Sequence, residues 1–357
     1  MNEQNMIACP DCETPEGLGR REFILAAGGT VATLAALDAV PQLVRAQGTT
    51  VVQPAVQPVR AAKPAEALIR ELYQGLTVEQ RQRVVYPWNH GATATATPTR
   101  KRMYNGAIFA AHNIAAVYTP AQKELNQRIF RAIGSGEEGY RQLSRGNTFD
   151  GSNSFERCGA YIFGDPTGDN QFAWVFTGHH LTVRCDGNSE ANTGFGGPMY
   201  YGHTPDGMSA RNVFNFQTRS AIAVWDALSE AQRRTATILM YPQPSEQEGS
   251  VRFRALGQAY PGISIRDLTA DQRRLVEQVM RDLLSPYRRE DGDEVMELVR
   301  RNGGLDRLSL GFFKNAGTAA GSWDYWRIEG PGFVWNFRVL PHVHCFVNIG
   351  LQAPARG

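Results

Sequence analysis

Two blocks of short, apolar, turn-linked segments are the feature that most constrains the fold of this 357-residue chain. The strand-like segments are 158–163 and 172–185 in the first block, and 307–313, 323–329, 333–340 and 343–349 in the second. Turn sequences, Gly-Asp-Pro-Thr-Gly at 164–168 and Glu-Gly-Pro-Gly at 329–332, connect neighbouring segments within each block. Short adjacent strands joined by such turns favour antiparallel pairing. The sequence therefore predicts an antiparallel sheet.

Helix starts are marked by one recurring pattern, Ser/Thr-x-x-Gln. The pattern occurs at Thr77–Gln80, Thr119–Gln122, Ser229–Gln232 and Thr269–Gln272. It is a capping box, in which the first side chain and the Gln side chain satisfy backbone amides that have no partner at a helix start. The repetition has two interpretations, an ancient duplication of a helical unit or independent convergence on good caps. We favour convergence.

The helix expected from Thr269 carries a broad apolar stripe. Leu275, Val279 and Leu283 form one ridge at i, i+4 spacing, and an adjacent ridge runs beside it, which is typical of a helix packed on a sheet. A second, shorter helix is expected over 293–301. Because the helical segments are grouped before and between the strand blocks, the predicted fold class is α+β, an antiparallel sheet packed by capped amphipathic helices.

The first 46 residues have the organisation of a secretory leader. Arg20-Arg21 precede an apolar stretch of 15 residues at 23–37, and Val44-Arg45-Ala46 offers a small-residue cleavage site. The stretch is shorter than the roughly 20 residues that span a bilayer. The arginine pair favours the twin-arginine route. We therefore expect the twin-arginine export machinery as a partner, a periplasmic or otherwise extracytoplasmic location, and no stable membrane anchor after cleavage.

The rest of the chain divides into a tether and one domain. Residues 47–64 contain repeated prolines and no helical period, which indicates a linker, and residues 65–357 are expected to form a single domain. Without the leader the chain has 34 basic and 29 acidic residues, a formal charge of +5. This weak charge, with no Lys/Arg-rich block, argues against a nucleic-acid partner. Three cysteines remain after export, Cys158, Cys185 and Cys345, so at most one disulfide is possible among them.

Histidines give the strongest chemical signal. His342-Val343-His344 lies in a strand-like segment, where residues two apart point to the same face, so both imidazoles would project together. Such a pair presents two nitrogen ligands to a divalent transition metal such as zinc, copper or iron. Pro341 just before it favours a sheet edge or a bend.

The second histidine pair, His179-His180, gives a weaker signal. Adjacent strand residues point to opposite faces, so only one of the two could join a site on a given face, and we prefer His180. Glu329 and Asp324 are the carboxylates nearest in sequence to the His-x-His pair, and Glu329 is the candidate general base. The alternative is that all these histidines are structural, with ring nitrogens bonded to the backbone.

The stretch Phe163-Gly164-Asp165-Pro166, continued by Trp174 to Leu181 with its Gly-His-His-Leu sequence, resembles a signature of the bacterial and fungal family named domain of unknown function 3500. The Ile328-Glu329-Gly330-Pro331 hairpin and the following His342-Val343-His344 are similar to the closing part of that family. After His344 the chain departs from the family pattern. The resemblance implies an often exported protein and supplies no reaction.

Two hypotheses follow. The first is an exported metal-dependent hydrolase or oxidoreductase, in which His342, His344 and His180 or His179 hold a divalent ion. The alternative is a non-catalytic extracytoplasmic protein that binds a small molecule in an aromatic groove. The aromatic residues offered for this groove are Trp174, Tyr200, Tyr201, Trp323 and Trp326.

Overall fold

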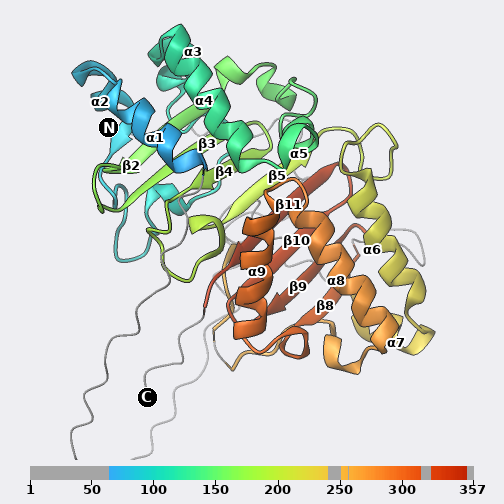
Figure 1. Cartoon of the computed structure of the whole chain (residues 1–357). Helices are drawn as coiled ribbons and strands as arrows, with labels where there is room; N and C mark the ends of the chain where they lie inside the picture. Colours follow the sequence, from blue (N-terminus) through green and yellow to red (C-terminus); the bar gives the residue numbers. More distant parts are fainter. Residues whose placement is uncertain (1–63, 240–250, 256, 315–322, 352–357) are drawn as a thin grey trace, which may run out of the picture. The chain divides into compact units, whose positions relative to one another are not determined.

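A computed structural model describes residues 64–239, 251–255, 257–314 and 323–351 (Figure 1). The leader at 1–46 and nearly all of the linker lie outside the described residues, so their expected structure stays a prediction. No helix in these four described stretches combines the length and the apolar character needed to cross a bilayer.

An 11-stranded sheet forms the centre of the structure, in the order β1-β2-β3-β4-β5-β11-β10-β9-β8-β6, with β7 paired to β8. The strands are β1 (Val85–Tyr86), β2 (Gly159–Gly164), β3 (Phe172–Gly178), β4 (Leu181–Cys185), β5 (Met199–His203), β6 (Thr237–Ile238), β7 (Ile263–Ser264), β8 (Ser309–Phe313), β9 (Tyr325–Gly330), β10 (Phe333–Arg338) and β11 (Val343–Ile349). Only β1–β2 and β6–β8 pair in parallel among these strands. The predicted α+β class is confirmed.

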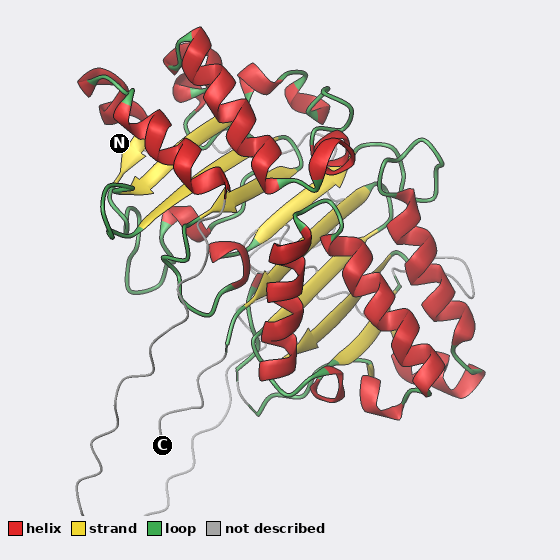
Figure 2. Ribbon diagram, viewed as in Figure 1, coloured by secondary structure: helices red, strands yellow, loops and turns green. Residues whose placement is uncertain are grey.

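The longer helices cover one face of this sheet (Figure 2). The α-helices are α1 (Pro64–Gln74), α2 (Val78–Val84), α3 (Ile114–Val117), α4 (Pro120–Ile133), α5 (Gly136–Leu143), α6 (Asn215–Ala227), α7 (Glu230–Ala236), α8 (Ala270–Leu284) and α9 (Arg289–Arg301). The expected stripe of α8 is buried at Val276, Val279 and Leu283. Burial of such apolar stripes against the sheet is the main source of stability. Helix α9 begins four residues before the predicted start at 293.

All four predicted capping boxes are present, at the starts of α2, α4, α7 and α8. Their glutamines also bond to each other in two pairs. Gln80 Nε2 donates to Gln122 Oε1 at 2.7 Å, and Gln272 Nε2 donates to Gln232 Oε1 at 2.8 Å. The glutamine bonds therefore hold the starts of α2 and α4 together, and likewise the starts of α7 and α8.

The two glutamine pairs belong to two halves of the sheet that repeat one topology. In each half a helix pair leads to a short strand, which pairs in parallel with the first strand of an antiparallel series: β1 with β2–β5, and β6 with β8–β11. The last strands of the halves, β5 and β11, pair antiparallel at the centre. The shared order and pairing favour duplication, contrary to our preference for convergence on good caps.

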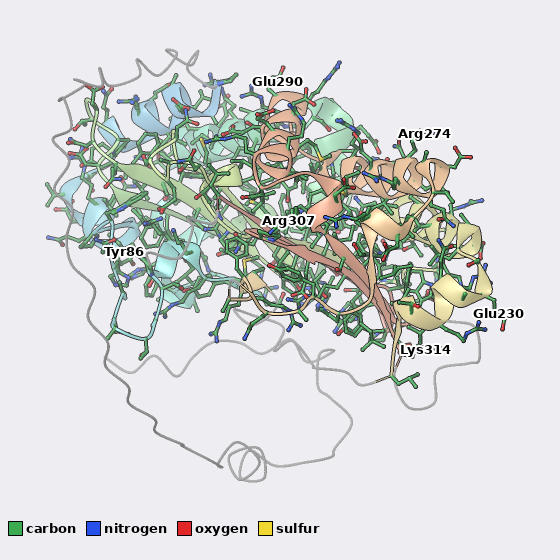
Figure 3. The ribbon with its side chains drawn as sticks, turned by 90° about the horizontal axis from the view of Figure 1, so that it is seen from below. Tyr86, Glu230, Arg274, Glu290, Arg307 and Lys314 are labelled. Atoms are coloured by element: carbon green, nitrogen blue, oxygen red, sulfur yellow. The ribbon has the colours of Figure 1, made fainter. Side chains whose placement is uncertain are left out.

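The opposite face of the sheet, here called the polar face, carries polar side chains beside a small apolar cluster and is covered by connecting segments. Tyr104 N donates to Thr182 Oγ1 at 3.3 Å, and Asn348 Nδ2 donates to the Val251 carbonyl at 2.7 Å. Figure 3 shows Arg274 and Glu290 projecting from the helical layer, on α8 and α9. The strands therefore separate an apolar, helix-covered side from a polar side, and the histidines lie on the polar side.

One expectation about the strands is wrong. Residues 172–185 are not one strand, because Gly178 pairs with Leu181 and the two histidines between them form a tight turn. Of the two alternatives for Pro341, a sheet edge or a bend, the structure has the bend, since β11 lies between β5 and β10. Pro341 lies in the connection before β11, where its missing amide interrupts no pairing.

Candidate metal centre

Three histidines gather at one row of the sheet's polar face. His344 on β11 pairs with Gly202 on β5 and with Arg338 on β10. Gly202 N donates in turn to the His180 carbonyl at 2.9 Å. The row therefore runs from His180 through Gly202 and His344 to Arg338. His342 lies two residues before His344, on the same face, as the strand period predicts.

His180 reaches this row because of its backbone conformation. Its φ of 53° is left-handed, and it is the second residue of the two-residue turn between β3 and β4. Its amide donates to Asn105 Oδ1 at 2.6 Å, which holds the turn. The His180 ring centroid lies 4.8 Å from that of His342 and 4.6 Å from that of His344. The turn, and not strand alternation, brings His180 to the site.

The three imidazoles form a compact set of potential ligands. One nitrogen from each of His180, His342 and His344 lies within 4.8 Å of the others, and all three side chains are buried. His342 Nε2 and His344 Nε2 are 2.9 Å apart. Two nitrogens bound at about 2.0–2.1 Å to one tetrahedral zinc ion would lie about 3.3 Å apart, so a small adjustment suffices. The histidines could therefore hold a metal ion.

Asp150, at the start of a short 3-10 helix (Asp150–Ser152), orients His180. Its Oδ2 lies 2.7 Å from His180 Nδ1 and accepts a hydrogen bond from Thr204 N at 3.1 Å. A proton on Nδ1 leaves the Nε2 lone pair for a ligand, an arrangement that metal-bound histidines commonly show. Sequence reasoning missed Asp150, because its segment lies 30 residues before His180 in the chain and carries no motif.

Burial alone would raise the pKa of Asp150, but interactions with the side chains of His179 and His180 hold this pKa well below its usual range. The same environment disfavours charge on the imidazoles. Burial lowers the pKa of His180 to about 4, although the bond to Asp150 opposes the shift. Asp150 is therefore a carboxylate and His180 a neutral imidazole at physiological pH.

Arg338 contacts the other two imidazoles directly. Its Nη2 lies 3.0 Å from His342 Nε2 and 2.8 Å from His344 Nε2. Burial first, and then this guanidinium, lower the pKa of His342 to about 3 and that of His344 well below its ordinary value. Both imidazoles are therefore neutral and able to accept hydrogen bonds or to bind a metal ion.

His179 and His203 lie beside the three-histidine set and outside it. His179 Nδ1 accepts a hydrogen bond from Gly151 N at 2.9 Å and lies 3.8 Å from Asp150 Oδ2. With Asp150 and His180 it makes a second possible ligand group. His203 Nδ1 accepts from Val213 N at 3.1 Å, a bond to the backbone. Of the four predicted ligands, the structure brings His180, His342 and His344 together, with His179 adjacent.

Glu329, the predicted general base, is not brought to the histidines. It lies on the polar face but opposite Val334, four residues along β10 from Arg338, which is on the order of 13 Å. Its carboxylate forms ion pairs with Arg327 at 2.6 Å and with Arg254 at 3.0 Å. Asp150 is the carboxylate that touches a site histidine.

The predicted aromatic groove is also not formed. Trp174 and Trp326 are 0% and 1% exposed and belong to the main hydrophobic core, together with Tyr201 and Trp323. Strand alternation places Trp174, Tyr201 and Trp326 on the helix-covered side. Tyr200 alone lies at the site, with its ring edge-on to His344 at 5.5 Å between centroids. It stacks on Phe346 at 4.6 Å and forms an apolar wall.

Comparisons with known proteins place the chain in one family. No curated protein and no solved structure matches it. The sequence pattern of one family, described as "Protein of unknown function (DUF3500)", matches residues 58–348, a range that contains all the histidines of the site. The chain therefore belongs to the DUF3500 family.

Proposed function

We propose that this protein is an exported metal-dependent enzyme, a hydrolase or an oxidoreductase. Its centre would be a divalent transition metal bound by His180, His342 and His344. The observation that carries the proposal is the convergence of three buried, neutral imidazoles within 4.8 Å, one of them oriented by the Asp150 carboxylate. Three histidines leave a coordination position open, as in catalytic sites, whereas structural sites are usually closed.

Each residue of the proposed site would have its own role. His344 presents its Nε2 atom from β11 and His342 from the bend just before this strand, and His180 completes the set from the other half of the sheet. Asp150 holds the tautomer of His180. A bound ion would supply Lewis acidity for hydrolysis, or electron transfer if it is copper or iron. Glu329 lies in a different part of the polar face, so we assign it no step.

Elemental analysis of the exported protein tests the proposal. The native protein should contain about one equivalent of zinc, copper or iron. A His342→Ala/His344→Ala double variant should lose this metal while its circular dichroism stays native. His112→Ala, outside the cluster, is the matched control and should retain the metal. A native protein purified without metal, which also fails to take up added ions, would overturn the proposal.

A second candidate is a non-catalytic protein that binds a small molecule through the same residues. The observation in its favour is the contact of Arg338 Nη2 with both His342 Nε2 and His344 Nε2, because a metal ion would need the same lone pairs. Histidines and Arg338 would then act as hydrogen-bond partners of the ligand. If the native protein is metal-free and binds small anions, the non-catalytic binding function is favoured.

Export by the twin-arginine route is part of the proposal. Proteins that use this route are folded before transport, which suits a site loaded inside the cell. N-terminal sequencing of the protein from the extracytoplasmic fraction should give a start near residue 47. An Arg20→Lys/Arg21→Lys variant should accumulate uncleaved in the cytoplasm. Normal processing of that variant would exclude the twin-arginine route.

A further inference from the structure

We propose that Arg338 is an internal competitor of the metal ion: its guanidinium holds His342 and His344 when no ion is bound, and an ion must displace it from them. The inference rests on the proposed metal centre and names the residue that limits its metal affinity. It starts from three nitrogen atoms. Arg338 Nη2 lies 3.0 Å from His342 Nε2 and 2.8 Å from His344 Nε2, and the two Nε2 atoms are 2.9 Å apart.

The contacts with Arg338 determine where the two imidazoles carry their protons. A guanidinium has donors and no acceptor, so each Nε2 that it contacts accepts with its lone pair. Burial first, and then Arg338, lower the pKa of both imidazoles, so each ring is neutral and carries its single proton on Nδ1. Two Nε2 atoms without protons then lie 2.9 Å apart, and the positive guanidinium offsets the repulsion between them.

The backbone holds Arg338 beside these imidazoles. Arg338 pairs with His344 between β10 and β11, and its Nε donates to the His342 carbonyl at 3.2 Å. Neither contact uses an imidazole nitrogen, so both can remain when an ion is bound. Only Nη2 has to leave the two Nε2 atoms.

A metal ion needs the same lone pairs that Nη2 contacts. An imidazole nitrogen has one lone pair, which cannot accept a hydrogen bond and bind a metal at the same time. The guanidinium cannot lose its charge, so it also repels a dication placed beside it. A ligand shifts an equilibrium only by its different affinity for the two states, so contacts made only in the ion-free protein lower the affinity for the ion. Arg338 therefore weakens metal binding, while it keeps both lone pairs directed at the centre.

Zinc affinities of arginine variants test the inference. Full-length proteins are refolded from denaturant with zinc, so that the ion need not reach buried histidines through the folded chain, and a chromogenic chelator competes for the metal. Arg338→Gln should bind zinc about tenfold or more tightly than wild type, because it lacks the two charge-assisted hydrogen bonds that oppose the ion. Arg338→Lys keeps the charge and should lie between the two. Arg274→Gln, an exposed arginine on α8, is the matched control and should leave the affinity unchanged.

Nitrogen NMR of the metal-free protein with labelled histidine gives a second readout, one that a purely structural role of Arg338 would not change. In wild type, Nε2 of both His342 and His344 should lack a proton. In Arg338→Gln, one of the two should carry a proton and donate it to the other, because two lone pairs at this distance repel each other without the guanidinium. A proton on either Nε2 of wild type would overturn the inference.

The outcomes of the zinc measurement separate this inference from the proposed function. Zinc bound by both proteins, and more tightly by Arg338→Gln, supports both. An equal or lower affinity of Arg338→Gln overturns the competition and leaves the metal centre standing. If only Arg338→Gln takes up zinc, the competition stands and the proposed function of the native chain fails. If neither protein takes up zinc, both fail.

Discussion

His180 and Gly332 occupy the same position in the two halves of the sheet. Each is the second residue of a two-residue turn, in Gly178-His-His-Leu181 between β3 and β4 and in Gly330-Pro-Gly-Phe333 between β9 and β10. Both have a left-handed φ, 53° for His180 and 62° for Gly332. Each carbonyl accepts a hydrogen bond of 2.9 Å from a glycine amide, that of Gly202 in β5 for His180 and that of Gly350 just after β11 for Gly332. One half therefore carries an imidazole where its repeat carries no side chain.

This equivalence predicts how His180 can be removed with the least damage. Glycine adopts a left-handed φ at little cost, whereas alanine there costs roughly 1 kcal/mol more. His180→Gly should therefore unfold in urea at a higher concentration than His180→Ala, and both should lose the metal. Equal stability of the two variants would contradict the assigned backbone role.

Asp150 is expected to act through His180. Asp150→Asn removes the carboxylate but keeps the shape of the side chain, so the tautomer and basicity of His180 are no longer fixed. Loss of such an outer partner typically weakens metal binding about 10–100-fold. Competition with a chromogenic chelator measures the affinity. Asp169→Asn, an exposed aspartate, is the control, and an equal loss there would show that the effect is unspecific.

The histidine cluster predicts a pH dependence of stability. The pKa of His180 is lowered to about 4 and that of His342 to about 3, against an ordinary value of 6.5. Below pH 6.5 the unfolded chain therefore binds more protons than the folded protein, and the free energy of unfolding falls as the pH falls from 6.5 toward 3. Urea unfolding of metal-free protein at several pH values should show this slope. The His342→Ala/His344→Ala variant should have a shallower one.

The repeat also predicts a compensating substitution in the core. Trp174 Nε1 donates to Asn126 Oδ1 at 3.1 Å, whereas its counterpart Trp326 has no hydrogen-bond partner for Nε1 among the described residues and lies near Val276. Asn126 and Val276 hold equivalent positions, seven residues after the cap residues of α4 and α8. Val276→Asn would supply the missing acceptor.

The matched control for that substitution is Val279→Asn, one turn further along α8 and also buried. Both changes bury an amide, but only the first offers the amide a partner. Val276→Asn should therefore cost about 1–2 kcal/mol less stability than Val279→Asn, as measured by thermal unfolding. An equal cost would mean that the two halves do not superpose at this position.

Local patterns in the sequence were sufficient to predict many of the helix starts and strands. The capping boxes, the stripe of α8 and the strands β2 and β8 to β11 were predicted, because caps and periodicity depend on residues within a few positions of each other. Strands β1, β5, β6 and β7 were not predicted. The pairing of Gln80 with Gln122 was not, because it joins residues 42 positions apart. The turn at His179-His180 was also missed, since a His-His pair is not one of the Gly-, Asn- or Asp-containing pairs that mark a tight hairpin turn.

The candidate site was likewise predicted from the sequence only in part. The sequence by itself determined that His342 and His344 project together, because a strand has a period of two residues. The sequence also favoured His180 over His179 as the third member. Only the tertiary structure decided that Glu329 lies away from the set, that Asp150 orients His180, and that Arg338 lies against both other imidazoles. The physical reason is that these contacts depend on the register between β5, β10 and β11 and on one left-handed turn. Neither leaves a local pattern in the chain.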